Sequence, residues 1–554
     1  MSIILLNSCE QKNIGDSVII RIPNDPEALN PFNHYSFRTT QIFDNIYQRI
    51  LEVTLPNGEL KPILTHGIPI VENADGQFFI NLAIREDAYW TSGNPITTED
   101  IEFTLKLLSG NQFENKAIAS TISFIEKIEV SNKQDITLFL TSSNQDQVRR
   151  LSDFYIFPRH IIDPDDLLSE YEYPLQAKHE DLNDFFESIN RLNFLEDAQK
   201  ITGSQAYEIS EWIPGRRVVL NKKLDFWFKG NFDIQYSSNP DQIIFERIDN
   251  VNTAISALQS EQINVLDQIP PLDFHQITNS ALLKEKYKFY SVATFGFEYI
   301  GINSRLSLFE DIYTRQAIAW LIPYDEIIES VLYGYGDRTI GFIQPHQKGL
   351  YNSSILPRNY NLDSAKNCLQ KAGWRLNDGI LQRHKNGITE QLEFSITYAA
   401  THVHHESIAL IVKDALKKAN IRLELASVET NMLASKCRNH EYETIIRGLF
   451  GGPDSFNYEY ILHSSAAKIG GMNYTAFGTE ESDSLIHAIN NTQNSELKKN
   501  LLMRFQEIVH EQSNILFLYS DNNNIAISNK FENVQISNLK PGYRIASFSL
   551  TGDQ

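Results

Sequence analysis

The richest group of metal-binding side chains in the sequence is the set His402, His404 and His405. Two imidazoles at this spacing could bind a transition metal, because histidine nitrogen is a common ligand of zinc, copper and nickel. No cysteine or second histidine cluster accompanies them in the sequence. The pattern also suits a loop before a helix expected from Glu406 to Ala419, where exposed histidines are tolerated. We expect no bound metal and no cofactor.

Catalytic motifs with the correct spacing are missing from the sequence. His405 and Glu406 are not followed by the second histidine of a H-E-x-x-H zinc protease. Gly334, Gly336 and Gly341 have the wrong spacing for a loop that binds a nucleotide phosphate. A G-x-S-x-G nucleophile motif is not present either. We therefore expect a binding protein and not an enzyme.

Length and charge restrict the class of protein further. A chain of 554 residues is too long for one core, so we expect two or three domains. The formal net charge of −21 argues against a nucleic-acid partner, since phosphate binding needs a basic surface. No run approaches the roughly 18 apolar residues that a membrane-spanning helix needs. The three cysteines cannot form a disulfide framework.

One stretch predicts a strand, a turn and a capped helix in succession. Phe78, Ile80, Leu82 and Ile84 alternate in position with the polar residues Gln77, Asn81 and Arg85, which is the period of a half-buried strand. Trp90 then precedes a Ser-Gly-Asn-Pro turn that ends the strand. Thr97 follows as a helix N-cap, and Asp100 completes a capping box.

The order of residues in this stretch resembles a family signature. Arg85, Trp90, Ser92-Gly93-x-Pro95 and Thr98-Glu99-Asp100 resemble the extracellular solute-binding proteins of family 5, which are oligopeptide-, dipeptide- and nickel-binding components of ABC importers. Thr98 stands where alanine is usual. Further segments that resemble the family are 25–31, 58–62, 157–161, 299–303, 314–322 and 360–374.

The resemblance implies a fold and a division of the chain. The expected fold is α/β, of the type II periplasmic-binding-protein kind, with two lobes, an extra domain and a ligand cleft between the lobes. The expected divisions are 1–13 for a lipoprotein signal remnant and tether, 14–54, 193–294 and 521–554 for domain I, 55–192 for domain II, and 295–520 for domain III.

The resemblance also implies a function. We expect a monomeric solute-binding protein of an ABC importer, which captures peptides or peptide-like solutes and delivers them to a membrane permease. One alternative is a relative that binds a metal chelate, a sugar or an opine-like molecule. Another alternative is a receptor that senses solutes without transporting them.

The first residues resemble the end of a bacterial lipoprotein signal. Apolar residues from Ile3 to Leu6 precede Ser8 and Cys9, and a small residue before a cysteine is typical of a lipidation site. The apolar stretch is shorter than the usual length of about 7–15 residues, and no basic region precedes it. The alternative is an ordinary N-terminus with a free cysteine. We expect a lipid anchor on Cys9 and a location on the periplasmic or cell-surface side of a bacterial membrane.

The family resemblance implies a ligand site between the first and third domains. In relatives that bind peptides, an acid in a segment similar to W-x-A-D-Y-x-x-P pairs with the α-amine of the peptide. Here Gly451 or Gly452 stands at the position of that acid, and Asp454 could replace it only if the loop turns inward. We therefore expect ordinary free-amine peptides to bind weakly.

Arg447 is the expected charged contact, because its planar guanidinium can form two parallel hydrogen bonds with a carboxylate. The alternative is an ion pair with Glu441 or Glu443. Aromatic side chains would add apolar and stacking surface. The complete set of expected ligand contacts is His34, Tyr35, Phe37, His405, Arg447, Leu449, Phe450, Asp454 and Phe456.

Overall fold

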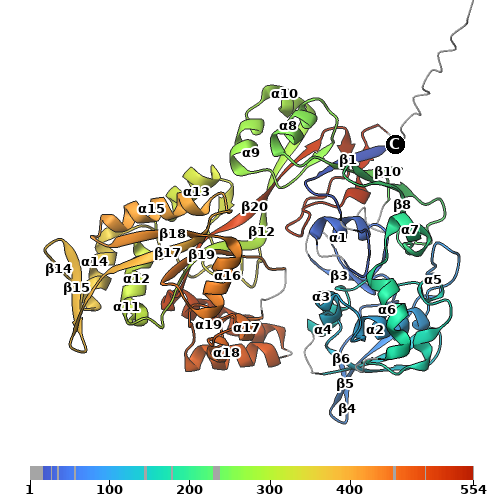
Figure 1. Ribbon diagram of the computed structural model, residues 1–554, viewed down its shortest axis with the longest axis horizontal. Helices are drawn as coiled ribbons and strands as arrows, with labels where there is room; N and C mark the ends of the chain where they lie inside the picture. The colour runs from blue at the N-terminus through green and yellow to red at the C-terminus, as the bar shows by residue number, and fades with distance from the viewer. Residues whose placement is uncertain are drawn as a thin grey trace, which may run out of the picture.

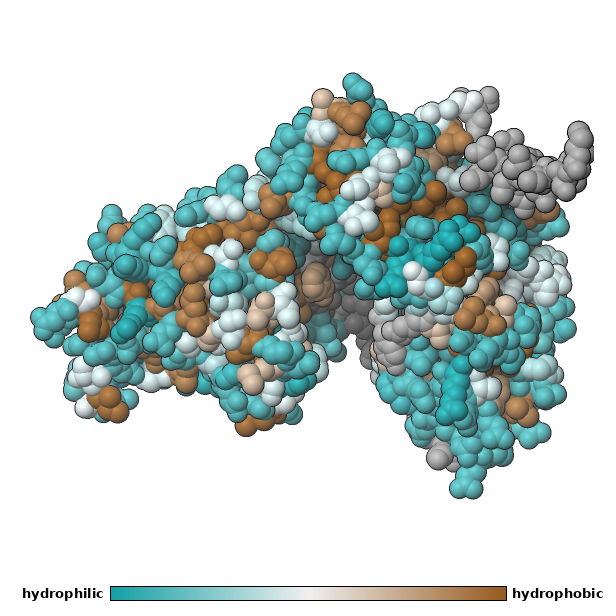
Figure 2. Space-filling model, turned by 45° about the horizontal axis from the view of Figure 1, so that its top comes forward, coloured by the Kyte–Doolittle hydropathy of each residue, from teal (hydrophilic) through white to brown (hydrophobic). Residues whose placement is uncertain are grey.

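Two long antiparallel strands, β12 (Tyr287–Ile302) and β20 (Ile515–Ser528), connect the two lobes of the protein (Figure 1). The computed structural model describes residues 16–552 except 27, 34–35, 55–57, 142–145, 176–178, 229–237, 453–456 and 493. The first lobe contains the chain up to β10 and the C-terminal segment, and the second lobe contains most of the chain between β12 and β20. A space-filling view shows a notch between the lobes (Figure 2).

Within the described residues, eleven strands form one sheet that passes through both lobes. The strand order is β18-β17-β19-β12-β20-β11-β1-β10-β9-β8, and β13 pairs with β20 beside this path. The second-lobe strands are β17 (Glu393–Ala399), β18 (Arg422–Val428) and β19 (Thr444–Leu449). The others are β1 (Ser17–Ile22), β8 (Tyr207–Ile213), β9 (Arg217–Lys222), β10 (Gln242–Arg247), β11 (Val265–Leu266) and β13 (Gly336–Asp337).

The predicted strand, turn and helix lie in the first lobe, where the strand belongs to a smaller sheet. Its strand order is β4-β5-β7-β6, with bounds Glu72–Ala74, Gln77–Ala83, Asp135–Leu140 and Ile125–Val130. Helix α2 (Thr98–Ser109) begins at the predicted capping box of Thr97 and Asp100. Asp100 also accepts hydrogen bonds from the Trp90 indole at 3.2 Å and from the Arg159 backbone N–H at 3.0 Å. The predicted order of strand, turn and capped helix is therefore confirmed.

Helices cover both faces of the sheet in the second lobe (Figure 1). Their bounds are α12 (Ile312–Leu321), α13 (Tyr324–Leu332), α14 (Leu362–Lys371), α15 (His405–Lys417), α16 (Thr430–Asn439), α17 (Tyr458–Ile461), α18 (Glu480–Asn491) and α19 (Ser495–Gln512). Trp374 is fully buried among them, and its indole donates a 2.9 Å hydrogen bond to Thr314. Among the helices that the structure describes, none combines the length and apolarity needed to cross a bilayer.

A buried ion pair ties together three distant segments of the first lobe. Arg38, on helix α1 (Phe37–Phe43), contacts both carboxylate oxygens of Asp267 at 2.5 and 2.9 Å. The Tyr543 hydroxyl donates a 2.8 Å hydrogen bond to the same carboxylate. The side chains of Arg38 and Asp267 are only 7% and 1% exposed. These contacts hold the C-terminal segment against α1 and the residue after β11.

We predict that Arg38→Ala lowers the free energy of unfolding by about 3–5 kcal/mol, because it leaves the charge of Asp267 buried without its partner. Urea denaturation measures the loss. The matched control is Lys127→Ala, which removes an ion pair with Glu129 whose side chains are 60% and 54% exposed. The control should cost less than about 1 kcal/mol. Equal losses in the two variants would contradict the role of the buried pair.

Candidate ligand-binding site

Lys540 lies between two aromatic side chains that come from different lobes. Its ammonium nitrogen is 5.9 Å from the centre of the Phe37 ring, at the start of α1. The same atom is 4.6 Å from the centre of the Phe450 ring, which follows β19 in the second lobe. The faces of both rings attract the cation. Two of the aromatic residues predicted to contact a ligand therefore meet at one lysine between the lobes.

A cavity of about 410 Å³ lies beside this lysine. Its volume falls within the range of about 300–1,000 Å³ that is usual for small-molecule sites. Gly452 of the second lobe contributes to its lining, together with Lys540 and other residues of the first lobe. The charged residues of the lining are Asp44, Arg49, Glu52, Arg149, Asp153, Lys540 and Arg544. The wall therefore carries both signs of charge.

Two carboxylates of the cavity wall are paired with arginines. Asp44 forms a 2.6 Å ion pair with Arg49 and accepts a 2.7 Å hydrogen bond from Tyr155. Glu52 forms an ion pair with Arg544. Burial lowers the pKa of Arg49, but Asp44, Tyr155 and Glu52 together outweigh this effect and raise that pKa above its ordinary value. A cationic ligand group would have to compete with these arginines.

Arg447 lies on β19, opposite Tyr299 of β12. Its guanidinium carbon is 5.1 Å from the centre of the Tyr474 ring. Among the described residues it forms no ion pair with Glu441 or Glu443, and Glu443 instead accepts two 2.7 Å hydrogen bonds from Ser395. The Nη1 atom of Arg447 is buried without a hydrogen-bond partner in the described part of the chain. This nitrogen is a donor that an anionic group could use.

The guanidinium of Arg447 remains charged despite partial burial. Burial lowers its pKa, but Tyr299, Cys437 and Tyr474 together outweigh that effect and raise the pKa above its ordinary value. Side chains alternate along a strand, so Arg447 and the neighbouring Gly448 face opposite sides of the sheet. Leu449 faces the same side as Arg447 and packs against the hydrophobic cluster that contains Phe297.

On the side of Gly448, Glu298 contacts two of the three predicted histidines. His405, the first residue of α15, places Nε2 at 3.2 Å from one carboxylate oxygen of Glu298. His402 places Nε2 at 3.6 Å from the other oxygen. The two imidazole rings are stacked, with centres 3.7 Å apart and planes 12° apart. His405 is buried, so the interpretation of these residues as an exposed loop is wrong for His405.

Burial determines the charge state of this group. It raises the pKa of Glu298 above its ordinary value and lowers the pKa values of His402 and His405 to about 4. Sequence reasoning missed Glu298, which lies 107 residues before His405. The signal in the sequence was a single charged residue inside the otherwise uncharged and mostly apolar strand sequence 292–302.

The remaining predicted site residues cannot be placed. Cys9, His34, Tyr35, Asp454 and Phe456 lie outside the described residues.

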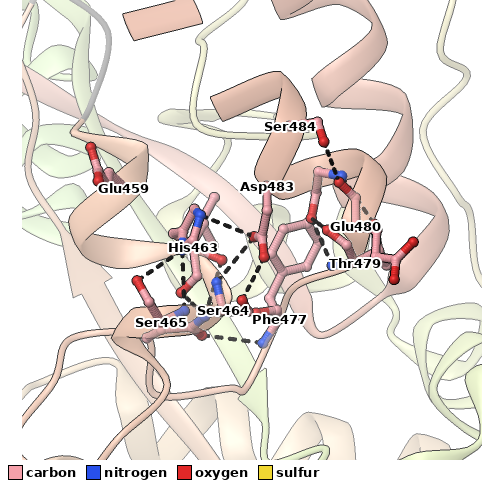
Figure 3. A network of polar contacts seen from close by, with 12 residues as sticks. Glu459, His463, Ser464, Ser465, Phe477, Thr479, Glu480, Asp483 and Ser484 are labelled. Atoms are coloured by element: carbon pink, nitrogen blue, oxygen red, sulfur yellow. Dashed lines mark hydrogen bonds and ion pairs between the residues drawn. The ribbon is translucent and has the colours of Figure 1, made fainter. Parts of the chain in front are cut away.

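A second polar group has the residue types of a catalytic triad but not its geometry (Figure 3). The Ser465 hydroxyl is 2.8 Å from Nδ1 of His463, and Nε2 of His463 is 3.9 Å from Asp483. The same Nδ1 accepts a 3.1 Å hydrogen bond from the Ser465 backbone N–H, and Asp483 accepts hydrogen bonds from Ser464. These contacts cap the short 3-10 helix Ser464–Ala466 and attach it to α18. We assign the group to local structure.

The model of the bacterial extracellular solute-binding proteins, family 5, matches residues 71–469 of the chain. The chain belongs to this family. The resemblance seen in the sequence is therefore confirmed, and the protein is a solute-binding protein of the kind that serves ABC importers.

Similar proteins include binders of different solutes. The oligopeptide-binding protein AppA of Bacillus subtilis (strain 168) is 24% identical over 548 residues, which cover 97% of this chain and 92% of AppA. The solved structure of AppA with a nonapeptide has a TM-score of 0.68 at 22% identity, covering 96% of this chain and 98% of AppA. NikZ of Campylobacter jejuni, solved with Ni(L-His), has a TM-score of 0.68 at 18% identity, covering 97% and 99%. The expected periplasmic-binding-protein fold is confirmed.

The close approach of Glu298 to β19 requires glycine at position 448. A Cβ at Gly448 would lie 2.3 Å from a carboxylate oxygen of Glu298. We predict that Gly448→Ala lowers the free energy of unfolding by about 1–3 kcal/mol through overpacking, as measured by chemical denaturation. Gly341→Ala is the control, because a Cβ there meets no heavy atom within 4 Å.

Adding Glu298→Ala to the Gly448 variant should remove the clash. The double variant should then lose less stability than the sum of the two single losses. A Gly448→Ala protein as stable as the Gly341 control would show that the strand accommodates the methyl group without displacing Glu298.

Proposed function

We propose that this family 5 protein captures peptides or peptide-like solutes between its lobes and delivers them, as a lipid-anchored monomer, to an ABC permease. The cavity beside Lys540 is the observation that supports this proposal most directly. Its lining includes Gly452 from the second lobe and Lys540 from the first, so a solute there can contact both lobes. A ligand that makes such contacts favours the arrangement in which the lobes are closed.

The proposed contacts fit a solute with apolar and anionic groups. Phe450, whose side chain is 63% exposed, and Phe37 offer aromatic surface on the two sides of Lys540. Arg447 is the proposed partner of a carboxylate, since Nη1 has no partner among the described residues. Asp44 and Glu52 already pair with arginines, so neither is free to bind an α-ammonium group. These features support a peptide-like solute whose N-terminus needs no charge.

We predict that N-acetylated Ala-Phe-Ala binds at least as tightly as the same tripeptide with a free amine. A free amine that finds an acid would gain about 1.5–3 kcal/mol, which is about tenfold to hundredfold in affinity. Isothermal titration calorimetry of the two peptides measures the difference. A free-amine form that binds tenfold more tightly, with the advantage lost in Asp454→Ala, would show that Asp454 replaces the missing acid.

Two aromatic variants test the location of the site in the same titrations. Phe450→Ala should weaken binding of both peptides by about tenfold, through loss of buried aromatic surface. Tyr460→Ala is the control, because Tyr460 is similarly exposed, at 57%, on α17 of the same lobe. No binding of either peptide to the unaltered protein, or equal effects of the two variants, would overturn the proposed function or its site.

The proposed membrane anchor depends on Cys9. A diacylglyceryl group together with an N-acyl chain would anchor the protein stably, because a single chain gives only marginal binding. We predict that the protein, expressed in bacteria behind a complete lipoprotein signal, partitions into a detergent phase, and that Cys9→Ala moves it to the aqueous phase. Cys368→Ala is the matched control and should leave partitioning unchanged. Equal detergent partitioning of the Cys9→Ala protein would remove the anchor.

A further inference from the structure

We propose that Glu298, His402 and His405 form a binding site for one divalent first-row transition-metal ion, such as Zn²⁺, Co²⁺ or Ni²⁺. This site is separate from peptide capture, and metal binding to it requires no solute in the cavity beside Lys540. The three side chains come from β12, from the loop after β17, and from the start of α15. The tertiary structure brings Glu298, which is distant in sequence, to the two histidines.

The donor atoms lie at separations that suit such an ion. Zinc binds histidine nitrogen and carboxylate oxygen at about 2.0–2.2 Å, which places neighbouring donors of a tetrahedral ion about 3.3–3.6 Å apart. Here the nitrogen–oxygen separations are 3.2 Å for His405 and 3.6 Å for His402. One ligand atom from each of the three residues lies within 4.8 Å of the others. Coordination requires the stacked rings to rotate, so that both nitrogen lone pairs point to one centre.

The hydrogen bonds between Glu298 and the two histidines are incomplete. The 3.2 Å contact of His405 with Glu298 has hydrogen-bond length, whereas the 3.6 Å contact of His402 is too long. An ion bound by the two Nε2 atoms and Glu298 would satisfy the Nε2 atom of His402, whose contact with Glu298 is too long for a hydrogen bond.

The chemistry of the donors selects the class of ion. Two imidazoles and one carboxylate suit zinc, cobalt or nickel, whereas magnesium and calcium prefer ligand sets made only of oxygen. Three protein donors also leave one position of a tetrahedral ion for water or an external ligand. His402 is the donor nearest to solvent, with a side chain that is 38% exposed.

The surrounding charge permits a cation. The positive charge of Arg447 lowers the pKa values of His405 and Glu298. The positive charge of Lys540 lowers the pKa of Asp521. Glu298 and Asp521 are acids, whose charge has the opposite sign to that of Arg447 and Lys540. The charge of Glu298 raises the pKa of Asp521. A bound ion would lie closest to Glu298, which supplies a negative ligand directly.

Metal titration of the full chain without an affinity tag tests the proposal. The protein is treated with EDTA, dialysed and titrated with Zn²⁺ against a chromophoric chelator, in the absence of peptide. Titration with Co²⁺ adds an absorption spectrum that reports the ligands. We expect one Zn²⁺ per chain and visible Co²⁺ bands, and we expect that excess Mg²⁺ does not compete.

Three variants locate the ion. His402→Ala and Glu298→Gln should each weaken Zn²⁺ binding by at least about tenfold, since loss of even an outer-shell partner costs about 10–100-fold. His404→Ala is the matched control, because His404 belongs to the same sequence cluster but not to the group of three. It should change the affinity by less than threefold. Far-UV circular dichroism and melting temperatures confirm that each variant is folded.

Three outcomes would overturn the proposal. These are no stoichiometric binding, unchanged affinity in both the His402 and Glu298 variants, or an equal loss in the His404 variant, which would place the ion on surface histidines. Peptide titrations are independent of all three, so failure of the metal site would not affect the proposed function.

Discussion

The pairing of β12 with β20 is the contact on which the two-lobed structure depends. The two strands run antiparallel from one lobe to the other, and their register shifts between Ala293 and Phe297. Side-chain and backbone hydrogen bonds fix this region, including those from Ser520 to the carbonyls of Thr294 and Gly296. A ladder of this kind satisfies the backbone of a chain segment that runs between two separate cores. Both lobes therefore contain strands of one shared sheet.

The same region contains three ionisable groups whose pKa values are shifted. Glu298 lies on β12 and Asp521 on β20, and burial raises the pKa values of both carboxyls above their ordinary values. Lys540 lies nearby, and burial lowers its pKa. Burying such groups is costly unless they gain partners. Shifted ionisable groups of this kind beside a cavity are typical of a site that binds another molecule.

Local physical chemistry made the first lobe's strand, turn and helix predictable. Alternation of apolar residues, a Ser-Gly-Asn-Pro turn and a capping box each involve neighbours in sequence, and the structure has all three in the predicted order. The family assignment rests on similarly local spacings. By contrast, the sequence offered two partners for Arg447 in Glu441 and Glu443, and neither forms an ion pair with it among the described residues. Glu443 instead contacts Ser395 of the neighbouring strand β17.

The histidine cluster shows where sequence information ends. By itself the sequence determined that the three histidines lie at the start of a helix, because the apolar periodicity of α15 lies within a dozen residues. It did not determine that His405 is buried or that Glu298 contacts it, since that contact depends on how β12 passes beneath the start of α15. Likewise, only the tertiary structure placed Phe37 and Phe450 at the same lysine. Propensities and caps act between near neighbours, whereas burial and the pairing of charges depend on how distant segments pack.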